Sequence, residues 1–258
     1  MRLKIFLSIA AVLAMAAFSF GQVKKPEPPA VRVPFEKSRQ AVVVMTPNWS
    51  AVQGTARFAE RNKGNSKWKW VSNEFPVVVG KSGLGVFRPD FDFDTVSKPP
   101  EPIKREGDGR APAGEFPLIS TFGNNDVGSK LPFTKLNEFT ECVDDTNSTF
   151  YNRIVNRMHV GNFDWNSSEK MLAVGPQYDL GVFVAYNSYP ANPGNGSCIF
   201  LHIWKDKSTG TAGCTAMARE NLERLVKWLD PKKNPYLMQM TSDSYKSSQQ
   251  SLKLPKLN

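Results

Sequence analysis

The stretch that decides the fold is Ser197-Cys198-Ile199-Phe200-Leu201-His202-Ile203-Trp204, the strongest β-strand pattern in the chain. Its β-branched and aromatic residues favour a pleated, half-buried strand. Runs of similar character, separated by clusters of Gly, Pro, Asn and Asp, occupy 41–45, 75–79, 116–120 and 180–186. Together these segments predict a mostly β domain.

One helix is expected after this region, between residues 218 and 230. The apolar positions recur at i, i+3, i+4 and i+7, at Leu222, Leu225, Val226 and Leu229. Pro231 ends the pattern, because proline removes a backbone donor and clashes within a helix. The strand and the helix therefore bracket a short loop, Thr211-Ala212-Gly213-Cys214.

His202 and Cys214 are the residues of this region that suit nucleophilic catalysis. A thiol becomes a good nucleophile when a nearby imidazole takes its proton and backbone N–H groups near a helix start favour the thiolate. The amides of Gly213 and Cys214 are candidate donors to a tetrahedral oxyanion. A core histidine beside a structural cysteine would give the same spacing, so spacing alone leaves both interpretations open.

The N-terminus has the pattern of an export signal over residues 1–21. Arg2 and Lys4 precede a charge-free apolar run, and Ser19-Phe20-Gly21 places small residues before a cut at Gln22. The apolar run is shorter than the roughly 20 residues of a spanning helix, so no membrane span is expected after cleavage. We expect export to a periplasm or cell wall.

Three further segments follow from composition. Residues 22–38 hold four prolines among charges and predict an extended linker. Residues 39–240 form one domain, and the Ser/Gln/Lys-rich stretch 241–258 predicts a flexible polar tail. With 33 basic and 24 acidic residues in 258, the net charge is +9, but no dense basic run with interleaved aromatics indicates nucleic-acid binding.

The sequence has three cysteines, an odd number, so at least one is free or pairs with another molecule. A disulfide between Cys142 and Cys198 would be possible in an oxidising compartment and would leave Cys214 free. Sequence does not fix this connectivity. The spacing of Cys and His suits no zinc site, and neither a metal nor a cofactor is expected.

The stretch from Ile199 to Met217 resembles the signature of the L,D-transpeptidase catalytic domain, the YkuD family of bacterial cell-wall enzymes. That signature is His-Gly, a variable loop, then Ser-x-Gly-Cys-x-Arg. Upstream, 75–81 resembles the strand and turn that open the domain, 110–116 resembles its Thr-Pro-x-Gly-x-Phe element, and 186–197 resembles the approach to the His strand. The likeness covers roughly residues 40–235 with the order of pieces preserved.

The resemblance implies a mostly β, YkuD-like sandwich with a few short helices, one of them after the cysteine loop. It implies that Cys214 is the nucleophile and His202 its base, with the backbone carbonyl of Ile203 orienting the imidazole and the Gly213 amide facing the oxyanion. We expect substrate contacts from three further residues, Thr211, Arg110 and Tyr186.

This sequence departs from the family signature at three positions. Ile203 replaces the usual Gly and is expected to narrow the cleft beside His202. Thr211 stands for the motif Ser and keeps its hydroxyl. Ala216 stands where the family has Arg, which leaves recognition of anionic substrate groups without its usual residue.

The leading hypothesis is an exported L,D-transpeptidase that forms an acyl-enzyme on stem tetrapeptides of peptidoglycan and transfers it to an amine, giving 3→3 cross-links. An L,D-carboxypeptidase that trims terminal D-Ala would use the same acyl-enzyme. A wall-binding protein without catalysis on the same fold is the third alternative.

Overall fold

A computed structural model describes residues 34–88 and 101–257 of the chain. The predicted signal peptide and most of the predicted linker lie outside these residues. The strands of the main sheet are β1 (Gln40–Thr46), β2 (Gln53–Glu60), β3 (Lys69–Trp70), β4 (Phe75–Val78), β5 (Leu84–Val86), β6 (Ala111–Gly123), β7 (Phe133–Lys135), β11 (Leu180–Val184), β12 (Phe200–Ile203), β13 (Thr215–Met217) and β14 (Tyr236–Thr241). A second sheet contains β8 (Thr140–Val143), β9 (Ile154–Asn156) and β10 (Ser168–Lys170).

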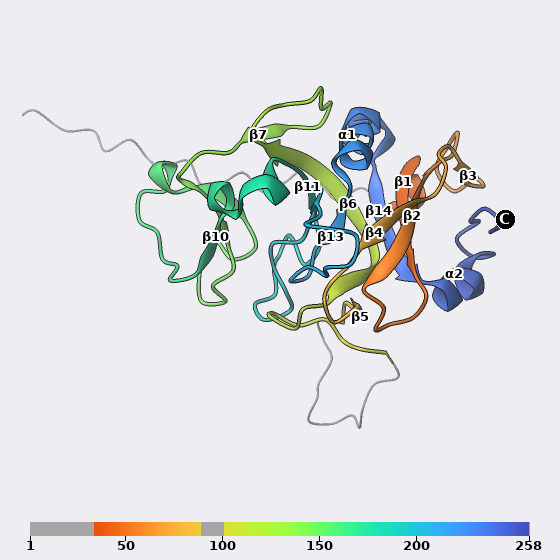
Figure 1. Cartoon of the computed structure of the whole chain (residues 1–258), viewed down its shortest axis with the longest axis horizontal. Coiled ribbons are helices and arrows are strands. Elements are labelled where there is room, and N and C mark those ends of the chain that lie inside the picture. The colour runs from red at the N-terminus through yellow and green to blue at the C-terminus, as the bar shows by residue number, and fades with distance from the viewer. Residues whose placement is uncertain (1–33, 89–100, 258) are drawn as a thin grey trace, which may run out of the picture.

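The main sheet closes on itself. Its strands pair in the order β1-β14-β6-β11-β12-β13-β4-β2, and β2 pairs again with β1. Closure satisfies the backbone groups that an open edge would expose. The predicted mostly β fold is confirmed, with the sandwich closed into a barrel-like form (Figure 1).

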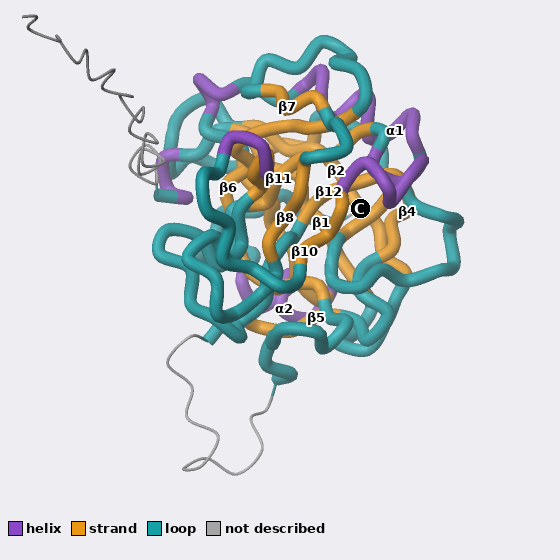
Figure 2. The backbone as a smooth tube through the Cα atoms, turned by 90° about the vertical axis from the view of Figure 1, so that its left-hand side faces the viewer, coloured by secondary structure: helices purple, strands orange, loops and turns teal. Residues whose placement is uncertain are grey.

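The helices are short and lie around the strands (Figure 2). They are α1 (Arg219–Trp228), α2 (Ser242–Ser248) and the 3-10 segments η1 (Phe35–Lys37), η2 (Arg157–His159), η3 (Met171–Tyr178) and η4 (Pro231–Lys233). The predicted amphipathic helix is α1, which buries Leu222, Leu225 and Val226. In the described ranges, 34–88 and 101–257, no helix has the length and apolar character needed to cross a membrane.

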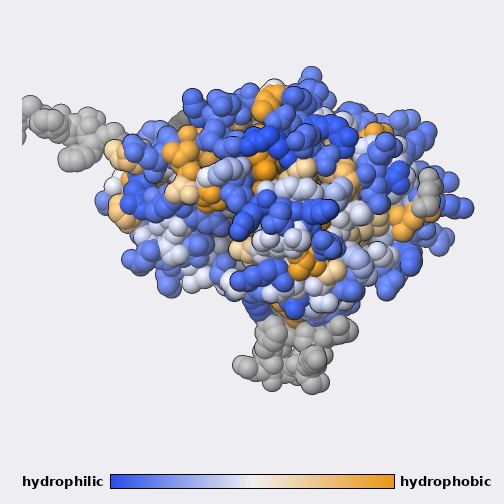
Figure 3. Space-filling view, in the orientation of Figure 1, coloured by the Kyte–Doolittle hydropathy of each residue, from blue (hydrophilic) through white to orange (hydrophobic). Residues whose placement is uncertain are grey.

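Strand β1 shows why the barrel forms here. All seven of its residues are buried. Val42 and Val44 face the main core, while Val43 and its alternating neighbours face a separate apolar cluster on the other side. A continuous β-branched run suits a strand covered on both faces. Apolar burial is therefore internal, and the face in Figure 3 is largely polar with apolar residues in small separate spots.

The expected flexible tail is wrong for residues 241–257. Tyr245 of α2 is fully buried against the outer face of β1, and Leu254 is 7% exposed in the same cluster. The Tyr245 hydroxyl donates to the Pro255 carbonyl at 2.7 Å, and the backbone N–H of Trp68 donates to the Lys253 carbonyl at 3.0 Å. The segment is polar in composition, yet Tyr245 and Leu254 pack it against the outer apolar face of β1.

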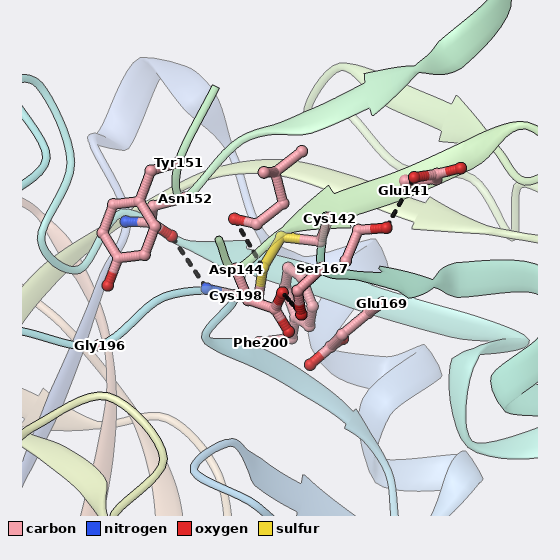
Figure 4. Close-up of a disulfide and its surroundings, with 12 residues drawn as sticks. Glu141, Cys142, Asp144, Tyr151, Asn152, Ser167, Glu169, Gly196, Cys198 and Phe200 are labelled. Atoms are coloured by element: carbon pink, nitrogen blue, oxygen red, sulfur yellow. Dashed lines mark hydrogen bonds between the residues drawn. A yellow bond between two sulfur atoms is a disulfide. The ribbon is translucent and has the colours of Figure 1, made fainter. Parts of the chain in front are cut away.

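The three-stranded sheet β10-β8-β9, here called the small sheet, packs against one side of the barrel (Figure 1). A disulfide joins Cys142 in β8 to Cys198, just before β12. Cys198 has φ +54°, and its N–H is held by the Asn152 side chain at 2.9 Å (Figure 4). A second apolar cluster fills the junction, and Cys214 belongs to it.

Candidate active site

Strands β12 and β13 bring the His and Cys segments side by side. They pair in parallel, with His202 opposite Ala216. Cys214 immediately precedes β13, and its sulfur accepts the Phe200 N–H at 3.3 Å. The connection between the strands contains an exposed turn in which Asp206 accepts hydrogen bonds from Ser208 and Thr209.

His202 is oriented by its own backbone. Its Nδ1 lies 2.8 Å from the Ile203 carbonyl oxygen, the contact that the family resemblance implies. A carbonyl oxygen only accepts, so Nδ1 carries the proton and Nε2 is left with the free lone pair. Burial lowers the pKa of His202 to about 4, against a smaller opposing effect of the Ile203 carbonyl. The imidazole is therefore neutral near pH 7 and able to accept a proton.

Cys214 is the free cysteine of the chain, all three cysteines lying in the described part. It is 6% exposed, and its S–H donates to the Cys198 carbonyl at 3.4 Å. Burial raises the pKa of the Cys214 thiol, and the Glu169 carboxylate raises it further. Lys104 opposes this effect. Both groups are therefore neutral near pH 7, the imidazole because burial lowers its pKa and the thiol because burial raises its pKa.

The loop before Cys214 is closed by Thr211. The Thr211 hydroxyl donates to the Cys214 carbonyl at 2.6 Å and accepts the Gly213 N–H at 3.1 Å. In this structure the Thr211 hydroxyl closes the loop and holds the Gly213 amide, and the substrate contact expected of Thr211 stays a prediction. A Cβ on Gly213 would lie 3.2 Å from the Arg110 carbonyl, so glycine permits the close approach.

Two further residues expected at the substrate, Arg110 and Tyr186, hold parts of the scaffold together in this structure, and their substrate contacts stay predictions. Arg110 Nη1 donates to the carbonyls of Ser82 at 2.6 Å and Leu84 at 3.0 Å, which ties the turn before β5 to the start of β6. Tyr186 is fully buried, and its hydroxyl donates to the Asn195 carbonyl. Both residues thus tie scaffold segments together, which their position in the motifs does not reveal.

The alternation of side chains along the strands explains where Ile203 and Ala216, which differ from the family signature, are placed. Ile203 faces the main core while His202 faces the junction with the small sheet, because successive strand side chains alternate. The expected narrowing of the cleft by Ile203 is therefore wrong. Ala216 is fully buried opposite both His202 and Val78, a place where a small apolar side chain fits.

Two residues that the sequence did not single out contact the thiol region. Tyr178, the last residue of η3, is 6% exposed, and its ring centroid is 5.3 Å from that of His202. Its hydroxyl is within hydrogen-bonding reach of Cys214 and donates to Glu169 of β10 at 2.7 Å. No sequence pattern marks either residue, since Tyr178 reaches the site from η3 and Glu169 from the small sheet, both more than 30 positions upstream of Cys214.

The fold and the junction together define a closed, mostly β domain with a neutral histidine and a buried free thiol on adjacent parallel strands. The sequence matches the family model of the L,D-transpeptidase catalytic domain, YkuD, over residues 55–237. This match spans most of the chain, so the protein belongs to that family. Among curated proteins, the comparison finds no match.

Proposed function

We propose that the protein is an exported L,D-transpeptidase that cross-links peptidoglycan stem peptides through an acyl-enzyme on Cys214. The observation that carries the proposal is the Nδ1 contact of His202 with the Ile203 carbonyl, beside the one free thiol. Family membership supports the class of reaction and a peptidoglycan substrate. The apolar run at residues 5–20 supports export.

The reaction follows from the protonation states of the pair. The Cys214 sulfur attacks the carbonyl carbon between the third stem residue and the terminal D-Ala, while His202 Nε2 takes the thiol proton. The C–N bond then breaks, and the imidazolium returns that proton to the nitrogen of the departing D-Ala. The amine of a second stem attacks the thioester, releases the thiol and forms the cross-link.

The neutral resting pair supports this sequence of steps. A permanently ionised thiolate would be strongly disfavoured at Cys214, because the residue is only 6% exposed and the Glu169 carboxylate is nearby. Proton transfer coupled to attack avoids that state. Candidate donors to the oxyanion are the amide of Cys214 and the amide of Gly213, the latter after it leaves the Thr211 hydroxyl.

The test is incubation of the purified chain from residue 22 onward with a disaccharide-tetrapeptide, followed by mass spectrometry of the products. We expect a cross-linked dimer and free D-Ala. Cys214→Ala should give neither product, whereas Cys214→Ser should retain a trace at most, because a hydroxyl is a poorer nucleophile beside a neutral imidazole. Full turnover by Cys214→Ala would refute the proposal.

Two other outcomes would replace the proposal by an alternative. Tripeptide without dimer would identify water as the acceptor and the protein as a carboxypeptidase. The absence of a covalent adduct with a carbapenem, in protein shown to be folded by its melting curve, would identify a wall-binding protein without catalysis.

A further inference from the structure

The Cys214 thiol has a second set of neighbours besides His202. Tyr178 reaches it from η3, and Glu169 reaches Tyr178 from β10 in the small sheet. Figure 4 shows Glu169 and Phe200 on the same side of the disulfide, where the small sheet meets β12. Tyr178 also packs edge-on against Phe200, with the ring centroids 5.5 Å apart. One tyrosine thus packs on the strand of the base, donates to a carboxyl group and lies within hydrogen-bonding reach of the thiol.

A tyrosine hydroxyl has a single proton, so Tyr178 can donate to only one neighbour at a time. When Glu169 is ionised, the carboxylate takes this proton as the stronger acceptor, and the sulfur loses its donor. When Glu169 is protonated, its own O–H can donate to the Tyr178 oxygen. The Tyr178 proton is then available to the Cys214 sulfur, where it would stabilise the developing thiolate.

We propose that Tyr178 and Glu169 are positioning residues that set the reactivity of Cys214: the Tyr178 hydroxyl turns from Glu169 to the sulfur when Glu169 takes up a proton. This inference rests on the proposed function in one respect, namely that Cys214 is the nucleophile. It adds a protonation switch that lies outside the Cys–His pair and comes from the small sheet.

The charges around Glu169 bring its ionisation into an accessible pH range. Burial raises the pKa of Glu169 to about 7, and the hydrogen bond from Tyr178 opposes this. Asp144, beyond β8, and Glu106, before β6, raise it further. The cation that acts on Cys214 is Lys104, which is itself paired with Asp108 at 2.8 Å. Above pH 7 the thiol therefore loses a donor and gains a negative neighbour together.

The expected signature is a break in the pH dependence of thiol reactivity. An isolated thiol is alkylated at a rate that rises tenfold per pH unit below its pKa, because only the thiolate reacts. In this protein the rate should rise, flatten near pH 7 as Glu169 ionises, and then rise again. Both rising parts have the same slope, and the flat part measures how far Glu169 raises the pKa of Cys214.

The experiment is alkylation of the full chain, with its disulfide intact, by iodoacetamide from pH 5 to 9.5. Intact mass gives the rate, since Cys214 is the free cysteine. Glu169→Gln should remove the flat part and react about tenfold faster than the wild type at pH 8.5, the effect of about one pKa unit. Tyr178→Phe should slow the reaction about tenfold below pH 7 and narrow the flat part, because the donor to sulfur is lost.

The matched control is Tyr245→Phe. Tyr245 is also buried and donates its hydroxyl proton, to the Pro255 carbonyl at 2.7 Å, but it lies in the separate apolar cluster on the outer face of β1. It should keep the flat part. An unbroken rise in the wild type, or a flat part that persists in Glu169→Gln, would overturn the proposal, and the wild-type profile decides this even if a variant does not fold.

Alkylation also separates this inference from the proposed function. Iodoacetamide needs no wall substrate. A break at pH 7 without turnover of tetrapeptide would therefore support the protonation switch and refute the proposed reaction. Cross-linking of stems together with an unbroken pH profile of alkylation would support the proposed reaction and refute the protonation switch.

Discussion

The barrel and the small sheet are stabilised in different ways. The barrel encloses a large core of aliphatic and aromatic side chains, and its strands are joined around a closed path. The small sheet contributes few apolar residues and is tied down by a disulfide and by the buried carboxylate of Glu141. The barrel supplies the backbone of the site, whereas the small sheet sets the electrostatic surroundings of the thiol.

Glu141 illustrates the polar construction of the small sheet. Its side chain is 2% exposed and pairs with Lys170 at 2.6 Å and Arg157 at 2.8 Å. Ser168 and the Trp165 indole also donate to it. Although burial alone would raise the pKa of Glu141, these donors lower it to about 2. The Glu141 carboxylate thus stabilises the small sheet by polar contacts, whereas apolar packing stabilises the barrel.

The largest effect is expected from a cavity in the barrel. Leu237 of β14 is fully buried in the main core. Leu237→Ala should lower the free energy of unfolding by about 3.5 kcal/mol, from lost burial and an unfilled cavity. Urea denaturation measures this. Leu172→Ala, at a side chain 41% exposed on η3, is the control and should change it by less than about 0.5 kcal/mol.

Removal of the disulfide should have a slightly smaller and more local effect. Replacing Cys142 and Cys198 together by Ala opens a loop of 56 residues. This should destabilise the protein by about 3 kcal/mol. Hydrogen exchange should accelerate in residues 140–170 while amides of β1 and β14 keep their protection. Equal acceleration in both regions would show that the small sheet and the barrel unfold as one unit.

Glu141→Gln should destabilise the small sheet by about 2 kcal/mol at pH 7, because it leaves buried donors and two cations without their carboxylate. The folded pKa of Glu141 is about 2, below its unfolded value, so its contribution is present above pH 5 and lost as pH falls toward 2. The melting temperature of the wild type should fall as the pH is lowered from 5 toward 2, whereas that of the variant should fall less.

The control for this pH dependence is Asp243→Asn, whose side chain is 90% exposed. Its melting curves should follow those of the wild type. A Glu141→Gln profile as steep as the wild type would assign the acid sensitivity to other carboxylates.

The smallest effect is expected at the surface between the two regions. Arg219, at the start of α1, pairs with Asp179, which follows Tyr178, at 2.5 Å. Both side chains are partly exposed, so Arg219→Ala should cost less than about 1 kcal/mol. A larger loss, measured by urea denaturation, would mean that this pair helps to hold η3, and with it Tyr178, against the barrel.

The sequence predicted the mostly β fold because several of its strands, such as β1, are continuous apolar runs that are recognisable without their partners. It failed at the C-terminus because the docking of Tyr245 depends on the second buried face of β1, which no local pattern marks. In the site, His202 and Cys214 follow from a motif. The scaffold contacts of Arg110 and Tyr186 were not predicted, because a motif does not distinguish scaffold from substrate contact. Tyr178 and Glu169 are brought near the thiol only by tertiary packing.

The parallel pairing of β12 with β13 has a consequence for how this protein can be altered. His202 lies in β12 and Cys214 immediately precedes β13, so the ladder between the two strands fixes how the two segments are aligned. The turn at 206–209 closes through its own Asp206 hydrogen bonds, and the hydrogen bonds of His202 and Cys214 go to other residues. It is therefore a permissive insertion point, where an epitope or a fluorescent peptide could label the protein without changing the pairing of β12 with β13.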